Sequence, residues 1–173
     1  MKKQDISENL VKLAYLALGS NLGNKIRNIE IAKFELEKYK IKILKSSSNY
    51  ISESWPDSSM PGYINVIIKI KTILSPIELL RICNIIELKM GRIRSKKNAP
   101  RVCDIDIIDY SKKILKENNG ELILPHPRMN NRNFVLLPLF EVDKSWNHPK
   151  SKINIVNLIN SLPIKDLRSI KQI

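Results

Sequence analysis

The residues best suited to chemistry lie close together near the middle of the chain, in the segment Pro100-Arg101-Val102-Cys103-Asp104-Ile105-Asp106. Because this segment is rich in isoleucine and valine, it predicts a β-strand, in which residues two apart project from the same face. Asp104 and Asp106 are therefore expected side by side, with Ile105 on the opposite face. Two neighbouring carboxylates repel each other unless a cation lies between them. Such a pair suits Mg²⁺, which binds one or two carboxylates together with substrate phosphates.

A cluster of basic residues precedes the two aspartates. Its simplest interpretation is a solvated loop, but lysine and arginine in such a cluster also bind phosphates, either of a nucleic acid or of a small polyphosphate. The close mixture of acids and bases favours the polyphosphate, because phosphoryl transfer uses both cations and metal-holding carboxylates. The cluster consists of Arg92, Arg94, Lys96, Lys97 and Arg101.

The composition predicts one folded domain that spans residues 1–173. Hydrophobic residues make up 43% of the chain, which is enough for a substantial core. The formal net charge of +13 indicates an anionic partner, such as a nucleic acid, a membrane surface or a polyphosphate. Cys83 and Cys103 are too few for a disulfide framework and lack metal-site spacing, so we expect a cytoplasmic protein. No apolar run is long enough to cross a bilayer.

Hydrophobic spacing places the elements that must position these residues. We expect a strand at 13–18, a tight turn at 19–23 and an amphipathic helix at 24–39. The alternation at 63–73 predicts a strand with Tyr63 and Asn65 on its polar face. A helix should begin at Ser75-Pro76-Ile77-Glu78, which is typical of a capping box, and end at Gly91.

Together with a weakly alternating stretch at 41–50 and the aspartate strand, these elements follow the order β-α-β-β-α-β. This order predicts an α+β fold, namely a ferredoxin-like antiparallel sheet with helices on one face and C-terminal additions. Further helices are expected at 134–140 and near 155–162.

Some residues are suited to binding a flat heterocycle. Tyr63 and Asn65 share one strand face and Trp55 lies in a loop nearby, so aromatic rings and an amide could hold such a ring. Each of them alone is more often a packing or turn residue. His126 has only His148 as a second histidine, which excludes a histidine metal cluster.

Taken in order, these segments resemble the 6-hydroxymethyl-7,8-dihydropterin pyrophosphokinases, a family of folate-biosynthesis enzymes. The resemblance covers residues 13–142 and leaves 143–173 as a C-terminal extension. It is carried by Leu18-Gly19-Ser20-Asn21-Leu22-Gly23, Tyr63-Ile64-Asn65, Glu87, Gly91-Arg92-Ile93-Arg94, Pro100-Arg101-Val102-Cys103-Asp104-Ile105-Asp106-Ile107-Ile108, Pro125-His126-Pro127-Arg128-Met129 and Asn131-Arg132-Asn133-Phe134-Val135-Leu136.

The resemblance implies an enzyme that moves the terminal pyrophosphoryl group of ATP onto the hydroxymethyl oxygen of the pterin and releases AMP. It implies two Mg²⁺ ions held by Asp104 and Asp106, which form the catalytic set together with Arg92 and Arg101. The residues that it implies for ATP are Glu87, Arg92, Arg94, Lys97, Arg101, His126 and Arg132. The residues that it implies for the pterin are Ser52, Trp55, Tyr63, Asn65 and Phe134. We expect the loops 92–98 and 52–61 to close over the substrates.

The main alternative is a basic RNA-binding module, because ferredoxin-like sheets also serve that function. Such modules carry aromatic residues on their central strands in a ribonucleoprotein pattern, which this sequence lacks. A second alternative is a catalytically inactive relative, against which the aspartates and arginines of the catalytic set argue. We therefore expect a monomer that binds ATP and the pterin, with no nucleic-acid or membrane partner.

Overall fold

The computed structural model describes residues 10–54, 59, 61–92, 100–116 and 121–173. None of the helices in this part of the chain is long and apolar enough to cross a membrane. The elements are β1 (Lys12–Ser20), α1 (Lys25–Glu37), β2 (Lys42–Ser46), β3 (Tyr50–Ser52), β4 (Tyr63–Thr72), α2 (Pro76–Lys89), β5 (Asp104–Tyr110), β6 (Leu115–Lys116), β7 (Ile123–Leu124), the 3-10 helix η2 (Met129–Asn131), α3 (Asn133–Val142), α4 (Ile155–Asn160), α5 (Ile164–Arg168) and β8 (Ile170–Gln172).

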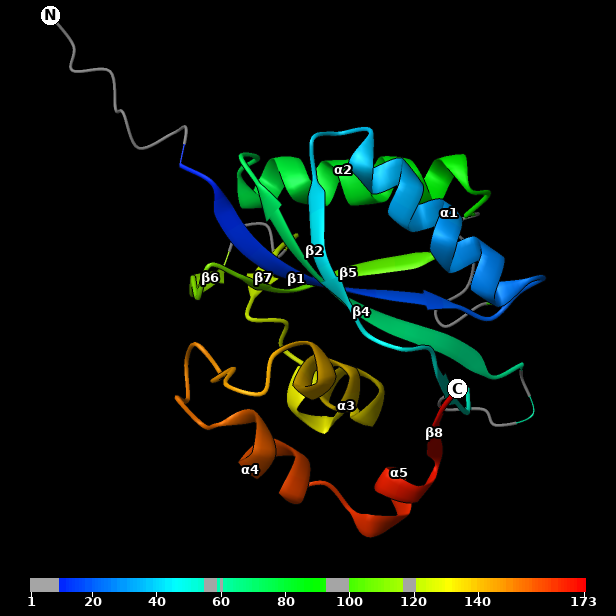
Figure 1. The fold of residues 1–173 in the computed structure, drawn as a ribbon, viewed down its shortest axis with the longest axis vertical. Helices are drawn as coiled ribbons and strands as arrows, with labels where there is room; N and C mark the ends of the chain where they lie inside the picture. Colours follow the sequence, from blue (N-terminus) through cyan, green and yellow to red (C-terminus); the bar gives the residue numbers. More distant parts are fainter. Residues whose placement is uncertain (1–9, 55–58, 60, 93–99, 117–120) are drawn as a thin grey trace, which may run out of the picture.

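Six strands form one antiparallel sheet in the order β5-β1-β4-β3-β8, and β2 pairs with β4 beside β3 (Figure 1). The expected α+β fold with an antiparallel sheet is confirmed. The sheet extends further than expected, because β3 and β8 add to it beyond β4. Strands of three residues are too short to show an alternating pattern in the sequence.

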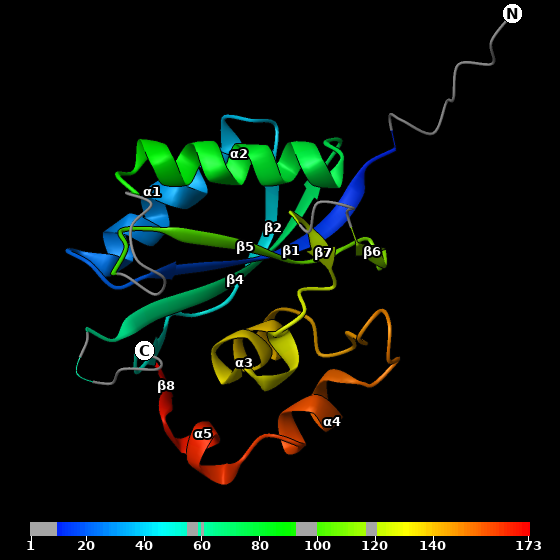
Figure 2. The same ribbon diagram turned by 180° about the vertical axis from the view of Figure 1, so that it is seen from behind.

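Helices pack on both faces of this sheet (Figures 1 and 2). The two expected helices, α1 and α2, cover one face and bury Leu16 and Leu18 of β1. The C-terminal additions cover the other face, where α3 and the segment after it bury Tyr15, Ile67 and Trp146. The result is a central sheet between two apolar layers, because alternate residues of β1 and β4 enter different cores.

Local sequence signals define where the two expected helices begin. The Oγ of Ser75 accepts the N–H of Glu78 (3.3 Å), and the Glu78 carboxylate accepts the N–H of Ser75 (2.7 Å), which forms the expected capping box. The side chain of Asn24 caps α1 in the same manner by accepting the N–H of Arg27 (3.1 Å). Gly91 follows α2 with a φ of +92°, a conformation that glycine adopts without strain.

The end of β1 differs from the expectation in a way that matters for the site. Gly19 and Ser20 belong to the strand rather than to a turn, because they pair with Asn65 and Ile64 of β4. Gly19 also pairs with Asp104 of β5 on its other side. The candidate residues of β4 and β5 therefore flank the end of β1, on the face that α3 covers further along the sheet.

Candidate active site

Asp104 and Asp106 are the first and third residues of β5 and share one face of the sheet, as their spacing predicts. Ile105 and Ile107 are 4% exposed on the opposite face, in the core under α1 and α2. The aspartate side chains keep 28% and 36% of their surface exposed. Both carboxylates are thus accessible to solvent on the same face of β5.

Two arginines contact Asp104. The Nη1 atom of Arg101 lies 2.9 Å from Oδ1 of Asp104, and the Nη1 atom of Arg92 lies 3.1 Å from the same oxygen. Burial and the negative charge of Asp106 raise the pKa of Asp104, whereas Arg101 and Arg92 act in the opposite direction. The structure therefore brings together four residues that the sequence assigned to catalysis.

Glu87 lies behind Arg92 in the interior of the protein. Its side chain is 4% exposed, and its Oε1 accepts the backbone N–H of Ile105 (2.7 Å) while its Oε2 forms an ion pair with Arg92. Burial raises the pKa of Glu87 to about 7. In this position Glu87 ties α2 to β5 and orients Arg92; the contact with the nucleotide that the resemblance implies stays a prediction.

Asp106 has its own neighbours, an arginine and a histidine. The Nη1 atom of Arg132 lies 3.2 Å from Oδ2 of Asp106, and Nε2 of His126 lies 3.7 Å from the same atom. The Nδ1 atom of His126 accepts the N–H of Arg128 (3.2 Å), so Nε2 carries the proton when the ring is neutral. Burial lowers the pKa of His126, which favours that neutral form.

The residues expected to bind the pterin approach the aspartates from β3, β4 and α3. Asn65 is 7% exposed, and its Nδ2 donates to Oγ of Ser52 (2.8 Å) and to the carbonyl of Tyr50 (3.4 Å). Tyr63 lies on the same face of β4 two residues away. The guanidinium of Arg132 lies 5.4 Å from the centre of the Phe134 ring, which links α3 to Asp106 through one side chain.

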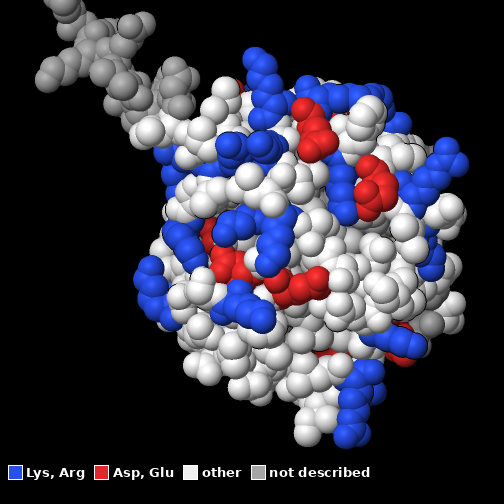
Figure 3. Space-filling model, viewed as in Figure 1, with Lys and Arg blue, Asp and Glu red and all other residues white. Residues whose placement is uncertain are grey.

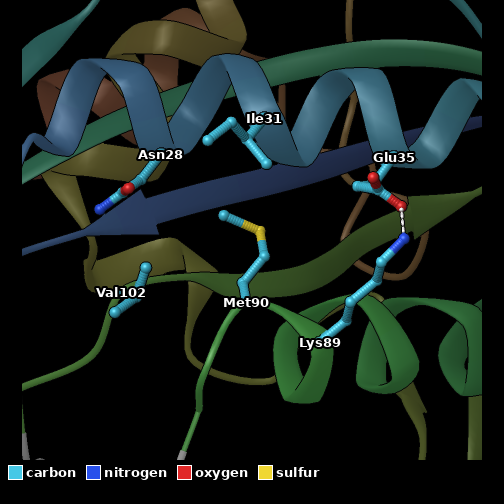
Figure 4. A pocket seen from close by; sticks show the side chains of 6 residues that line it. All are labelled: Asn28, Ile31, Glu35, Lys89, Met90 and Val102. Atoms are coloured by element: carbon cyan, nitrogen blue, oxygen red, sulfur yellow. Dashed lines mark hydrogen bonds and ion pairs between the residues drawn. The ribbon is translucent and has the colours of Figure 1, made fainter.

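A separate hollow of about 200 Å³ lies between α1 and the end of α2 (Figure 4). Oε2 of Glu35 and Nζ of Lys89 form an ion pair (2.6 Å) between the two helices there. Ligand sites usually enclose about 300 to 1,000 Å³. Because the hollow is smaller and lies on the other side of the sheet, it is not part of the aspartate site. It is lined by Asn28, Ile31, Glu35, Lys89, Met90 and Val102.

Comparison with known proteins places this arrangement in a family. The model of the family described as 7,8-dihydro-6-hydroxymethylpterin-pyrophosphokinase (HPPK) matches residues 15–144. The chain belongs to the HPPK family. The pyrophosphokinase of Synechocystis sp. is 38% identical over 150 residues, which cover 86% of this chain and 75% of the relative. That of Haemophilus influenzae is 36% identical over 141 residues, with 81% and 87% covered.

Longer relatives also match this chain, and solved structures share its fold. The "Folic acid synthesis protein fol1" of Pneumocystis carinii is 35% identical over 95% of this chain, but the chain spans only 22% of that protein. A crystal structure of Plasmodium falciparum HPPK-DHPS with pteroate superposes with a TM-score of 0.73 at 18% identity. It covers 95% of this chain and 47% of the Plasmodium chain, and at this identity it supports the fold alone.

Two residues that sequence reasoning missed hold the HPPK site together. Asn21 is 2% exposed, and its Oδ1 accepts the N–H of Arg101 (2.7 Å) while its Nδ2 donates to the carbonyl of Pro61 (3.3 Å). The Nζ of Lys25 donates to the carbonyl of Gly62 (2.7 Å). The start of α1 thus anchors the segments that lead into β4 and β5. The available signal was a polar asparagine directly after an apolar strand.

Some expected HPPK residues lie outside the described part of the chain. These are Trp55, Arg94 and Lys97, together with most of the two loops 52–61 and 92–98 that were expected to close over the substrates. Their expected roles stay predictions. The strand candidates lie toward one end of β3, β4 and β5, and the others lie on the segments next to them; the described candidates are Ser52, Tyr63, Asn65, Glu87, Arg92, Arg101, Asp104, Asp106, His126, Arg132 and Phe134.

The donor set fits Mg²⁺ rather than a metal held by protein ligands alone. Asp104 and Asp106 offer carboxylate oxygens on one accessible face. Within the described ranges, no group of three or more histidine, cysteine, aspartate or glutamate side chains is placed to hold a metal ion. A hard cation at this pair would need further oxygen ligands, and the phosphates of a nucleotide are suitable ones.

Proposed function

We propose that this chain transfers the pyrophosphoryl group of ATP to the hydroxymethyl group of 6-hydroxymethyl-7,8-dihydropterin, forming the pterin diphosphate and AMP in folate biosynthesis. The observation that carries the proposal is the pair of accessible carboxylates on β5, contacted by Arg92, Arg101 and Arg132, in a chain of the HPPK family. A site of this kind neutralises polyphosphate while it presents metal ligands.

The arginines are placed to hold and stabilise the transferred group. Arg92 and Arg101 contact Asp104, and Arg132 contacts Asp106, so cationic groups flank the carboxylates on both sides. When phosphates enter, these guanidinium groups can donate to phosphate oxygens without a large movement. The charge that develops during in-line attack of the hydroxyl on the β-phosphorus would then be stabilised by donors that are already oriented.

Asp104 and Asp106 would hold the magnesium, for which we propose two ions. When bound, Mg²⁺ supplies charge neutralisation and orders the ATP phosphates. Glu87 keeps Arg92 beside Asp104 through a buried ion pair, and Asn21 fixes the backbone of Arg101. The positions of both arginines are therefore set before any substrate binds.

The pterin would be bound next to the phosphates by β3, β4 and α3. The amide of Asn65 is fixed by Ser52, so its orientation is set before the ring arrives. Because its two N–H groups donate to Ser52 and Tyr50, the side-chain oxygen of Asn65 is left as an acceptor for an N–H group at the edge of the pterin. Tyr63 and Phe134 are the described aromatic residues proposed to contact the ring.

We also propose that the enzyme works as a cytoplasmic monomer. The described groups of the proposed site all come from this one chain. Cys83 and Cys103 are free and buried, as expected for a reducing compartment.

An RNA-binding function receives less support from the surface. In the view of Figure 3, lysine and arginine form separate groups divided by acidic and uncharged surface, and no continuous basic track crosses this face. A phosphate backbone is bound most strongly by such a track. The carboxylates beside the arginines would further weaken the binding of a phosphate backbone.

The test is a product assay with ATP, Mg²⁺ and 6-hydroxymethyl-7,8-dihydropterin. We expect AMP and the pterin diphosphate in equal amounts, with no AMP when the pterin is omitted. Asp106→Asn should lower kcat by on the order of a thousandfold without changing the melting temperature, because it removes a charge that acts on the reacting phosphates. Glu121→Gln is the matched control, since it neutralises an exposed carboxylate elsewhere. ADP as the product, or turnover independent of pterin, would refute the proposal.

A further inference from the structure

We propose that the C-terminal segment 164–173 positions the pterin-binding residues, an inference that rests on the proposed function. This segment contains α5 and β8 and follows the part of the chain that the family model matches. It attaches to the protein on two sides of the pterin-binding residues, at β3 and at the start of α3 (Figures 1 and 2). The segment therefore has a positioning role and need not touch a substrate.

The first attachment is a strand pairing. β3 has only three residues, and Ser52 in it lies between Tyr63 of β4 and Ile170 of β8. The Nε2 of Gln172 also donates to Oγ of Ser48 (3.0 Å), just before β3. Because a strand this short makes few hydrogen bonds with one neighbour, its position depends on having a second neighbour.

The position of β3 sets the orientation of Asn65. Its Nδ2 donates to Oγ of Ser52 and to the carbonyl of Tyr50, so both acceptors belong to β3. The side-chain oxygen Oδ1 of Asn65 then lies toward Gly19. It is 3.6 Å from the position that a Cβ atom on Gly19 would occupy. A shift of β3 would turn the amide that we propose reads the edge of the pterin.

The second attachment reaches the aromatic side of the same site. The Nδ2 of Asn133 donates to the carbonyl of Asp166 and to Oγ of Ser169 (3.2 Å). The Oδ1 of Asn133 accepts the N–H of Phe134 (2.7 Å). Asn133 thus links the C-terminal segment to the first turn of α3, which carries the Phe134 ring.

The hydrogen-bond pattern between β3 and β8 identifies a substitution that breaks their pairing without removing side-chain contacts. The N–H of Ile173 donates to the carbonyl of Asn49 (2.9 Å), and hydrogen-bonded pairs alternate along an antiparallel ladder. Lys171 opposite Ile51 is the next pair of that kind. Lys171→Pro removes its N–H, and Lys171→Ala is the matched control because the Lys171 side chain is exposed.

We expect Lys171→Pro to raise the KM for the pterin by on the order of tenfold, as loss of about one hydrogen bond of positioning would do. The KM for ATP and kcat should stay within about twofold of the wild type, because the ion pairs described for Arg92, Arg101 and Arg132 are made with Glu87, Asp104 and Asp106, outside this segment. Hydrogen–deuterium exchange at residues 48–52 should become faster in Lys171→Pro and not in Lys171→Ala. Asn133→Asp is the second variant, since it keeps the acceptor for Phe134 but loses the donor to Asp166; Asn157→Asp controls for the added charge.

The outcomes distinguish failure of the positioning role from failure of the proposed function. A wild-type enzyme that forms AMP with pterin, combined with equal pterin KM values in Lys171→Pro and Lys171→Ala, overturns the positioning role alone. In Lys171→Pro, an equal rise of the KM for the pterin and the KM for ATP would also overturn the positioning role, because it would show a purely structural effect. A lower melting temperature with both KM values unchanged would overturn it for the same reason. A wild-type protein that forms no AMP overturns the proposed function. Independently of activity, unchanged hydrogen–deuterium exchange at residues 48–52 in Lys171→Pro would show that β8 does not hold β3 in place.

Discussion

Glu87 provides the sharpest test of how the site balances burial against charge pairing. Its carboxylate is buried, accepts the N–H of Ile105 and forms an ion pair with Arg92. Burial is the largest influence and raises the pKa of Glu87 from 4.5 to about 7; the Ile105 N–H and Arg92 act in the opposite direction. The folded protein should therefore bind a proton at Glu87 that the unfolded chain releases between these two pH values.

The sign and size of the effect on stability follow by linkage. Because the folded-state pKa lies above the unfolded value, Glu87 carries no stability cost below pH 4.5, and a cost accumulates as the pH rises to about 7. Each pKa unit corresponds to about 1.4 kcal/mol, so the cost grows by roughly 2 to 3 kcal/mol between pH 5 and pH 8. The free energy of unfolding of the wild type should fall by this amount relative to a variant that cannot titrate.

Glu87→Gln is that variant, since its amide cannot ionise. Urea unfolding of both proteins at several pH values from 5 to 8 gives the difference in unfolding free energy, and subtraction cancels the other titrating groups. We expect Glu87→Gln to gain stability relative to the wild type as the pH rises, and its kcat/KM to fall below that of the wild type above pH 7, where the wild-type carboxylate is ionised and pairs with Arg92. Parallel pH profiles would refute the reasoning, because they would mean that Arg92 outweighs burial and keeps Glu87 ionised throughout.

Two further substitutions test the site and its scaffold. Arg101→Lys should lower kcat/KM by on the order of a hundredfold with an unchanged melting temperature, because lysine lacks the guanidinium geometry that suits phosphate; wild-type kinetics would exclude a phosphate-binding role. Trp146→Phe removes the indole donor to Oδ2 of the buried Asp109 (2.8 Å) and should lower the free energy of unfolding by about 2 kcal/mol in urea. If Asp109→Asn abolished none of that effect in a double-mutant cycle, the hydrogen bond would not be its cause.

The regular elements could be predicted because their patterns are long. β4 is ten residues long and carries Ile64, Val66, Ile68 and Ile70 at alternate positions, and the capping box at Ser75 defines the start of α2. The two carboxylates could be placed on one face for the same reason, since β5 keeps strict alternation over Asp104–Ile107. By contrast, β3 and β8 have three residues each and exist only because they pair with each other and with β4.

The least predictable part of the site was the support behind the arginines. Glu87 was expected at the nucleotide, yet the helix buries it on the same face as Leu79, Cys83 and Ile86. Its spacing of four residues from Cys83 carried that information, because residues four apart share a helix face. No spacing in the sequence indicated that Asn21 contacts Arg101, since the two residues are 80 positions apart.

The small residues at the end of β1 explain how one sheet face can be both a core and a site. Tyr15 is covered by the layer that contains α3, whereas Gly19 at the far end of β1 places no side chain between Asn65 and Asp104, both of which pair with it. Those two residues are separated by two strand spacings, about 10 Å. We propose that the pterin lies on the β4 side of Gly19 and the phosphates lie on the β5 side. A Cβ at Gly19 would meet Asn65 and Tyr63 at 3.6 Å, which is ordinary van der Waals contact, so neither a clash nor backbone strain requires glycine at this position.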